Sequence, residues 1–140
     1  MSRVAIVTGG TRGIGEAISI MLKDKGYKVA ANYGGNDERA KEFSNRTGIP
    51  AYKWDVSDFD ACAEGVAKVK AELGPIEILV NNAGITRDGT LHRMSHESWQ
   101  KVIDTNLGSC FNMCRVTIDD MRAAKFGRVI NIGSINGQAG

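Results

Sequence analysis

Three glycines near the amino terminus have the spacing of a phosphate-binding turn. Gly9, Gly13 and Gly15 follow the apolar run Val4–Val7 and open a segment with the pattern of a helix. In a strand, turn and helix of this kind, unpaired N–H groups and the helix dipole attract an anion, and glycine lets a pyrophosphate reach the backbone. No Gly-Lys-Ser/Thr triplet closes the turn, which argues against a P-loop. The turn residues assigned to dinucleotide binding are Gly9, Thr11, Arg12, Gly13, Ile14 and Gly15.

The residue at the end of the second expected strand bears on which dinucleotide binds. Folds that bind NAD usually place an Asp or Glu there, about 20 residues past the glycines, where it accepts hydrogen bonds from the adenosine ribose. The residue here is Asn32, and Arg12 and Arg39 lie close by in the sequence. Because no acid repels a 2′-phosphate, this pattern favours NADPH over NADH. Two alternatives stay open: the arginines are ordinary solvated side chains, or Asp37 replaces the missing acid.

Two further segments follow expected strands and could complete the site. Asp55 ends the third strand, where its carboxylate could accept from the adenine amine or simply cap the following turn. An irregular stretch of roughly residues 82–94 follows the fourth strand. A long loop just past the carboxyl end of a strand is where open parallel sheets build their sites.

The elements that must position these residues alternate along the chain. Helices between strands act as crossovers, so the strands should be parallel, with helices on both faces of the sheet. The sequence thus predicts one α/β domain, a doubly wound parallel sheet of the Rossmann type, over residues 1–140. Glycines at 26, 48 and 74 should end the first three helices. The five strands are expected at residues 4–7, 28–31, 51–54, 76–80 and within 127–133.

A fourth, longer helix is predicted from Ser95 to about Ala124. Asn106 falls inside its apolar stripe, and a carboxamide turned toward a core costs a few kcal/mol unless it is hydrogen-bonded. We therefore expect a partner for Asn106, and bracing a neighbouring loop is the simplest role. The stripe consists of Trp99, Val102, Ile103, Leu107, Cys110, Phe111, Cys114, Ile118 and Met121.

Composition narrows the classes of partner and location. With 18 Lys and Arg against 16 Asp and Glu, scattered along the chain, neither nucleic acid nor a membrane is an expected partner. The apolar runs are too short for a membrane span or a secretory signal, and three cysteines without a C-x-x-C pair fit a reducing compartment. The cytoplasm is therefore the expected location.

Two pairs of residues have the spacing of metal ligands. Cys110 and Cys114 are four residues apart, as are His92 and His96. The cysteines fall in the apolar stripe, where cysteine behaves as a small hydrophobe, and His92 falls in the irregular stretch. We therefore expect no metal site.

With these motifs in order, the chain resembles the short-chain dehydrogenase/reductase family over all 140 residues. The resemblance implies that Asp55 and Val56 bind the cofactor, and that the backbone of Asn82, Ala83 and Gly84 lies against it. It also implies that Ser134 donates a hydrogen bond to a ketone oxygen and that Asn106 holds a water in a proton relay. The motifs that carry the resemblance are Thr8-Gly9-x-x-x-Gly13-x-Gly15, Asp55-Val56, Asn81-Asn82-Ala83-Gly84, Asn106 and Ser134.

The segments 82–88 and 134–138 are similar to family members that reduce 3-ketoacyl thioesters. The resemblance implies NADPH-dependent reduction of an acyl-CoA thioester, acetoacetyl-CoA to 3-hydroxybutyryl-CoA for polyhydroxybutyrate synthesis, by a homotetramer with the long helix at a subunit contact. The alternative substrate is the same ketone on acyl carrier protein, because enzymes of fatty acid synthesis share the Ile-Thr-Arg-Asp segment at 85–88.

The chain departs from the family pattern at its carboxyl end. The tyrosine that gives its proton to the alkoxide, and the lysine four residues later, would lie beyond Gly140. We therefore expect residues 1–140 to be the amino-terminal part of a longer reductase domain, with a bare fifth strand and exposed apolar surface on the long helix. The other hypothesis is a nucleotide-binding or interaction module without catalysis.

Overall fold

The computed structural model describes residues 2–139 and contains one five-stranded parallel sheet. All four strand pairings are parallel, which confirms the predicted doubly wound sheet. In chain order the strands are β1 (Val4–Val7), β2 (Lys28–Tyr33), β3 (Ala51–Lys53), β4 (Ile76–Asn81) and β5 (Arg128–Asn131). Their order across the sheet is β3-β2-β1-β4-β5, so the chain reverses its direction of winding between β1 and β4. Such a switch point opens a crevice at the carboxyl ends of the strands.

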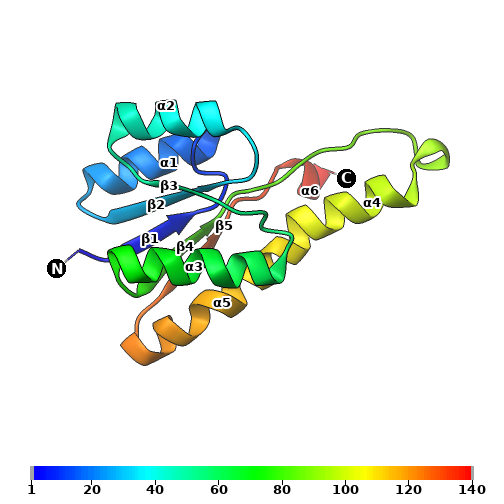
Figure 1. The fold of residues 1–140 in the computed structure, drawn as a ribbon. Coiled ribbons are helices and arrows are strands. Elements are labelled where there is room, and N and C mark those ends of the chain that lie inside the picture. Colours follow the sequence, from blue (N-terminus) through cyan, green and yellow to red (C-terminus); the bar gives the residue numbers. More distant parts are fainter. Residues whose placement is uncertain (1, 140) are drawn as a thin grey trace.

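Helices cover both faces of this sheet (Figure 1). The first pair, α1 (Gly13–Asp24) and α2 (Asp37–Thr47), lies on one face, and α3 (Phe59–Leu73) and α5 (Ser109–Ala124) lie on the other. Between β4 and α5 the chain forms a short helix, η1 (Leu91–Arg93), then α4 (His96–Ile103) and a π-helical segment, η2 (Asp104–Gly108). A last short helix, α6 (Asn136–Ala139), follows β5.

The core consists of two apolar layers, one on each side of the sheet. Alternate side chains of β1 enter opposite layers: Val4 and Ile6 pack toward α3 and α5, whereas Ala5 and Val7 pack toward α1 and α2. This is the period-two alternation of a strand covered on both faces. The predicted glycines follow the first three helices, and Gly48 ends α2 with φ of 75°, a conformation that favours glycine.

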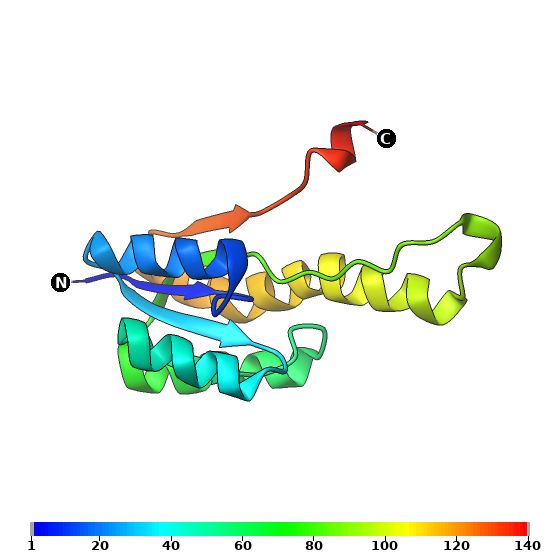
Figure 2. The ribbon, with the colours of Figure 1, turned by 90° about the horizontal axis from the view of Figure 1, so that it is seen from above.

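The long helix differs from the prediction in two ways. It is interrupted by η2, and much of its predicted apolar stripe faces outward rather than into the core. The helix and the loop before it extend beyond the carboxyl end of the sheet, so none of the strands in residues 2–139 lies beneath α4 (Figures 1 and 2). The face that does meet the sheet carries Ser109, Met113, Thr117 and Met121. The exposed members of the stripe are Trp99, Leu107, Phe111 and Ile118.

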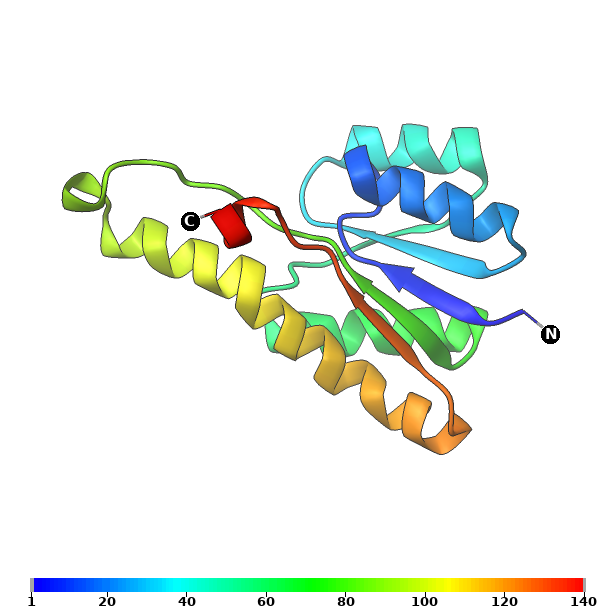
Figure 3. The same ribbon diagram turned by 180° about the vertical axis from the view of Figure 1, so that it is seen from behind.

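The fifth strand forms one edge of the sheet, on the side away from β3 (Figure 3). All four of its residues are exposed, and Val129 and Ile130 keep 40% and 47% of their surface. The expectation of a bare fifth strand and an apolar surface on the long helix is therefore confirmed. No helix among residues 2–139 has both the length and the apolar character required to cross a bilayer.

Candidate functional site

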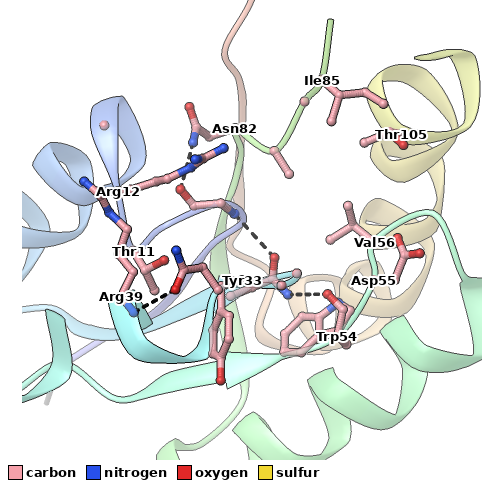
Figure 4. Close-up of a pocket in the computed structure, with 18 of the residues that line it drawn as sticks. Thr11, Arg12, Tyr33, Arg39, Trp54, Asp55, Val56, Asn82, Ile85 and Thr105 are labelled. Atoms are coloured by element: carbon pink, nitrogen blue, oxygen red, sulfur yellow. Dashed lines mark hydrogen bonds between the residues drawn. The ribbon is translucent and has the colours of Figure 1, made fainter. Parts of the chain in front are cut away.

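A cavity of about 870 Å³ lies at the carboxyl ends of the strands, where the winding reverses. Its walls come from the turn after β1, the ends of β2 and β3, the segment after β4, and α4 with η2 (Figure 4). A volume of this size is typical of small-molecule and cofactor sites. Every predicted cofactor-binding residue except Gly15 lines it: Gly9, Thr11, Arg12, Gly13, Ile14, Asn32, Arg39, Asp55, Val56, Asn82, Ala83 and Gly84.

The amino terminus of α1 lies at this cavity without a side-chain cap. Arg12 occupies the capping position in an extended conformation, and within residues 2–139 its side chain makes no capping hydrogen bond. By contrast, α2, α3 and α4 are capped by the side chains of Asn36, Asp58 and Ser95. The first N–H groups of α1 therefore remain available to an anion in the cavity.

The glycines of the turn fit a pyrophosphate against the backbone. A Cβ added at Gly13 would meet no atom within 4 Å, so its absence leaves open space. Gly15 has a different role, because a Cβ there would overlap the carbonyl oxygen of Gly9 and crowd the Asn82 side chain. Gly15 thus lets α1 pack closely on the turn, and it does not itself line the cavity.

Hydrogen bonds join the turn after β1 to the segment after β4. The buried Thr8 hydroxyl accepts from the N–H groups of Asn82 and Ala83, both at 2.9 Å. The Asn82 side chain donates in return to the carbonyls of Thr8 and Gly9, both at 3.2 Å. Thr8 therefore fixes the segment after β4, which forms one wall of the cavity. The sequence motif contains Thr8 but does not reveal this role, because the role depends on burial and on N–H partners 74 and 75 residues away.

Asn32 lines the cavity but uses its side chain to brace the backbone. Its Oδ1 accepts from the N–H of Gly9 at 3.4 Å, and its Nδ2 donates to the carbonyl of Trp54 at 3.1 Å. The residue is 2% exposed. It therefore ties the glycine turn to β2 and β3 from a fully buried position.

The charged residues at this end of β2 fall into two groups. Arg12 and Arg39 line the cavity on its α1 and α2 side (Figure 4). Asp37 instead pairs with Lys53 at 3.1 Å and accepts from the Tyr33 hydroxyl at 3.1 Å. These bonds, led by the one from Lys53, lower the pKa of Asp37. Asp37 is not among the residues that line the cavity, so the geometry favours the arginines over Asp37 as the groups that a bound nucleotide meets.

Asp55 caps a turn and also faces the cavity. One carboxylate oxygen, Oδ1, accepts from the Ser57 hydroxyl at 2.7 Å and from the Ser57 N–H at 2.9 Å. These two bonds lower the pKa of Asp55, and the positive charge of Lys101 contributes. Asp55 is therefore ionised at neutral pH and acts only as an acceptor. The alternative that Asp55 caps the following turn is therefore confirmed. The second carboxylate oxygen, Oδ2, stays available to accept from a ligand in the cavity.

Asn106 lies in η2 and is exposed, so the expectation that it faces a core is wrong. The expected partner is present: its Oδ1 accepts from the N–H of Ile85 at 2.8 Å, and its Nδ2 donates to the carbonyl of Ile85 at 2.9 Å. The carboxamide thus holds the segment after β4 against the π-helical turn. Ile85 and Thr105 line the cavity, so Asn106 supports its wall from behind.

Ser134 lies beyond β5 and is not among the residues that line the cavity. It is exposed, and its hydroxyl accepts from the N–H of Asn136 at 3.2 Å. The segment that carries it runs apart from α4 and α5 (Figure 2). The structure therefore brings the predicted cofactor residues together but does not bring Ser134 to them.

The Cys110/Cys114 and His92/His96 pairs, which have the spacing of metal ligands, belong to no larger cluster in the described residues. Among residues 2–139, no three His, Cys, Asp or Glu side chains gather in a way that would hold a metal ion. All three cysteines are free thiols, and burial raises the pKa of Cys62 to about 11.

Residues 3–140 match the family model for short chain dehydrogenases. The acetoacetyl-CoA reductase of Rhizobium meliloti (strain 1021) is 62% identical over 140 residues, which is all of this chain and 58% of that protein. The acetoacetyl-CoA reductase of Paracoccus denitrificans is 59% identical over 138 residues, covering 99% of this chain and 57% of that protein.

A 3-oxoacyl-acyl-carrier-protein reductase of Chlamydia muridarum (strain MoPn / Nigg) is 44% identical over 146 residues, covering 100% of this chain and 58% of that protein. The chain thus spans a little under three fifths of the length of these relatives. Because the family model covers nearly every residue, the chain belongs to the short-chain dehydrogenase family.

Proposed function

We propose that this chain forms the NADPH-binding part of a reductase that converts acetoacetyl-CoA to 3-hydroxybutyryl-CoA for polyhydroxybutyrate synthesis. The observation that carries the proposal is the uncapped amino terminus of α1, which lies with its glycine turn at a cavity of about 870 Å³. Two relatives that are 59% and 62% identical bear the name acetoacetyl-CoA reductase, which supports the substrate. The residues described here would be the amino-terminal part of the reductase domain.

The residues around the cavity fit a nicotinamide dinucleotide, which when bound supplies the hydride. The free N–H groups of α1 would bind the pyrophosphate, with Gly13 leaving it room. Asp55 and Val56 would meet the adenine, and the backbone of residues 82–84 would flank the adenosine ribose. Asn32 would contribute by holding Gly9 in place rather than by contacting the ribose directly.

Arg12 and Arg39 support the choice of NADPH over NADH. Both arginines line the cavity, and among the described residues the lining at the end of β2 contains no acid, since Asp37 pairs with Lys53 outside it. Replacing Arg39 by Ala should weaken NADPH binding by about 10- to 100-fold, as expected for a charge-assisted hydrogen bond, and leave NADH binding unchanged. Lys41→Ala, on the same helix but outside this cavity, is the matched control. Equal weakening of both cofactors would contradict the assignment.

Ser134 and Asn106 are assigned to the reaction itself. The Ser134 hydroxyl would donate to the ketone oxygen, where negative charge develops, and Asn106 would hold a water that passes a proton to the alkoxide. The two bonds between Asn106 and Ile85 fix the orientation of the carboxamide, and they leave one lone pair on Oδ1 and one hydrogen on Nδ2 that could hold the water.

A kinetic comparison tests the assignment of Ser134. In the full-length protein, Ser134→Ala should lower kcat by about 10²- to 10³-fold, the usual effect of removing one oxyanion donor, with NADPH affinity changed less than twofold. Ser134→Thr, which keeps a hydroxyl, should recover part of the rate. An equal loss of kcat and NADPH affinity would make Ser134 a structural residue.

The proposed substrate carries its acyl group on coenzyme A, and the alternative carrier is acyl carrier protein. The relative named for an acyl-carrier-protein substrate is 44% identical, lower than the acetoacetyl-CoA reductases, so coenzyme A is the favoured carrier. Parallel assays with acetoacetyl-CoA and acetoacetyl-acyl-carrier-protein test this directly. A kcat/KM at least tenfold higher for the carrier-protein thioester would reverse the choice.

We also propose that α4, η2 and α5 form a subunit contact of a homotetramer. Their outward side chains include Trp99, Leu107, Phe111 and Ile118, and Phe111 is 65% exposed. An apolar surface of this kind usually marks an interaction site. Light scattering of the full-length protein should show a tetramer for the wild type and smaller species for Phe111→Glu. A monomeric wild type would contradict the proposal.

A further inference from the structure

We propose that Lys101 is a nucleotide-binding residue that, together with Asp55, binds the edge of the adenine base. This inference rests on the proposed nucleotide site and assigns a residue of α4 to its base end. Lys101 was not a candidate in the sequence, because on the helix it is one more exposed lysine. Only the fold brings α4 to the cavity that begins at the glycine turn.

The two ends of the cavity carry different charges. Arg12 and Arg39 lie on the side of α1 and α2, where a phosphorylated ribose would lie, whereas Asp55 and Thr105 lie across the cavity from them (Figure 4). Lys101 lines the same cavity and precedes Thr105 by about one helical turn, so the two residues share one face of the helix. Lys101 therefore belongs to the Asp55 end, away from the two arginines.

Lys101 and Asp55 influence each other across this end. The positive charge of Lys101 is one of the causes that lower the pKa of Asp55. Lys101 has no ion-pair partner within 4.0 Å among the described residues, and the Asp55 carboxylate accepts its hydrogen bonds there through Oδ1. The pair thus presents an ammonium group and a free carboxylate oxygen, one donor and one acceptor, to whatever occupies the cavity.

Adenine matches this pair, and a 6-oxopurine does not. The adenine edge carries an amino group that donates, next to a ring nitrogen that accepts. Asp55 would accept from the amino group, while Lys101 would donate to the ring nitrogen. Hypoxanthine carries a carbonyl oxygen in place of the amine, so the Asp55 carboxylate would repel it, and this repulsion would keep the base out of the position in which Lys101 meets its edge. The pair therefore selects adenine nucleotides.

Equilibrium binding to three nucleotides tests this role without relying on catalysis. The probes are ADP, inosine 5′-diphosphate, and adenosine 2′,5′-bisphosphate, which carries a 2′-phosphate but one 5′-phosphate fewer than ADP. Each is titrated by calorimetry into the full-length protein. The variants are Lys101→Met, which removes the charge but keeps the length, Lys101→Arg, which keeps a donor, and Lys25→Met. Lys25 is an exposed lysine at the opposite end of α1 and serves as the matched control.

We expect the wild type to bind inosine diphosphate at least tenfold more weakly than ADP. Lys101→Met should weaken ADP and adenosine 2′,5′-bisphosphate by the same factor, about fivefold for one hydrogen bond, and change inosine diphosphate less than twofold. Lys101→Arg should recover most of the affinity, and Lys25→Met should match the wild type.

Each other pattern overturns the assignment. A loss confined to adenosine 2′,5′-bisphosphate would place Lys101 at the 2′-phosphate, and a loss shared with inosine diphosphate would make it a general attraction for phosphate. Unchanged affinities of Lys101→Met for all three nucleotides would mean that Lys101 is an ordinary solvated side chain. If the wild type binds none of the three nucleotides, the proposed nucleotide site itself fails, and that result is distinguishable from the failure of Lys101 alone.

Discussion

Two strands of the same sheet, β1 and β5, show how much position matters. Each is four residues long with apolar residues at its centre, yet every residue of β1 is buried and every residue of β5 is exposed. The first lies at the centre of the sheet with helices on both faces, and the second lies at its edge. The same difference separates the two parts of the candidate site, because β1 leads into the glycine turn and β5 leads to Ser134.

The glycine turn is held by contacts between residues far apart in the sequence, whereas Ser134 is held locally. Thr8, Asn32 and Asn82 connect the ends of β1, β2, β3 and β4 through hydrogen bonds. The hydrogen bond of the Ser134 side chain, by contrast, reaches only two residues along the chain. The cavity end of the candidate site is therefore preorganised in the described residues, whereas Ser134 is held by a local turn.

The largest expected difference between the two regions is in stability. Leu79 of β4 and Val129 of β5 are partners across the ladder, but Leu79 is fully buried and Val129 is 40% exposed. Leu79→Ala should lower the free energy of unfolding by about 2–5 kcal/mol, and Val129→Ala by less than about 1 kcal/mol. Urea unfolding of the two variants measures this difference. Equal losses would mean that another surface buries β5 in solution.

A second comparison uses one glycine from each region. Gly15→Ala should destabilise the protein by about 1–3 kcal/mol and abolish nucleotide binding, because the added Cβ overlaps the Gly9 carbonyl and pushes the turn apart. Gly133→Ala is the control, since a Cβ there meets no atom within 4 Å. Calorimetry with NADPH and thermal unfolding should separate the two variants. Normal binding by Gly15→Ala would refute the close packing of turn and helix.

The smallest expected effect concerns β3, the other edge of the sheet, which α3 covers. Burial and the hydrogen bond from its hydroxyl to Glu72, 3.0 Å long, raise the pKa of Tyr52 from 10.0 to about 12. Because the folded pKa lies above the unfolded value, this stabilisation is complete below pH 10 and is lost as the pH rises through about 12.

Tyr52→Phe should therefore cost about 1 kcal/mol at pH 8 and flatten the fall in stability above pH 10. Urea unfolding of the wild type and the variant between pH 8 and 12 measures both effects. If the two proteins lose stability in parallel above pH 10, then Tyr52 is not the group that titrates.

The local pattern of the sequence predicts most of the fold. Apolar runs and helix-ending glycines locate the strands and the crossover helices, and the crossovers imply a parallel sheet. The order of the strands was not predicted, because it depends on which strands pair in space. The interruption of the long helix at η2 was also missed, since the 3.6-residue period continues through it and only the contact between Asn106 and Ile85 reveals the reason.

Periodicity also overstated the buried part of the long helix. The helical period places Trp99, Leu107 and Phe111 in one apolar stripe, but all three are exposed. Periodicity predicts which residues share a face of a helix, and it does not predict whether another element covers that face. For the site, the sequence motifs identified most of the residues that line the cavity. They did not identify Lys101, because its residue type and spacing are those of an ordinary surface lysine. Its position depends on how α4 approaches the end of β3, which no local signal encodes.

Titration of the full-length protein with NADPH and with NADH tests the central claim, a dinucleotide site at the amino terminus of α1, most directly. We expect saturable heat with a stoichiometry of one per chain for NADPH, and an affinity for NADH at least tenfold lower, because only NADPH offers a 2′-phosphate to Arg12 and Arg39. Absence of saturable binding by either dinucleotide would contradict the account, because the cavity and the uncapped helix would then have no nucleotide to hold.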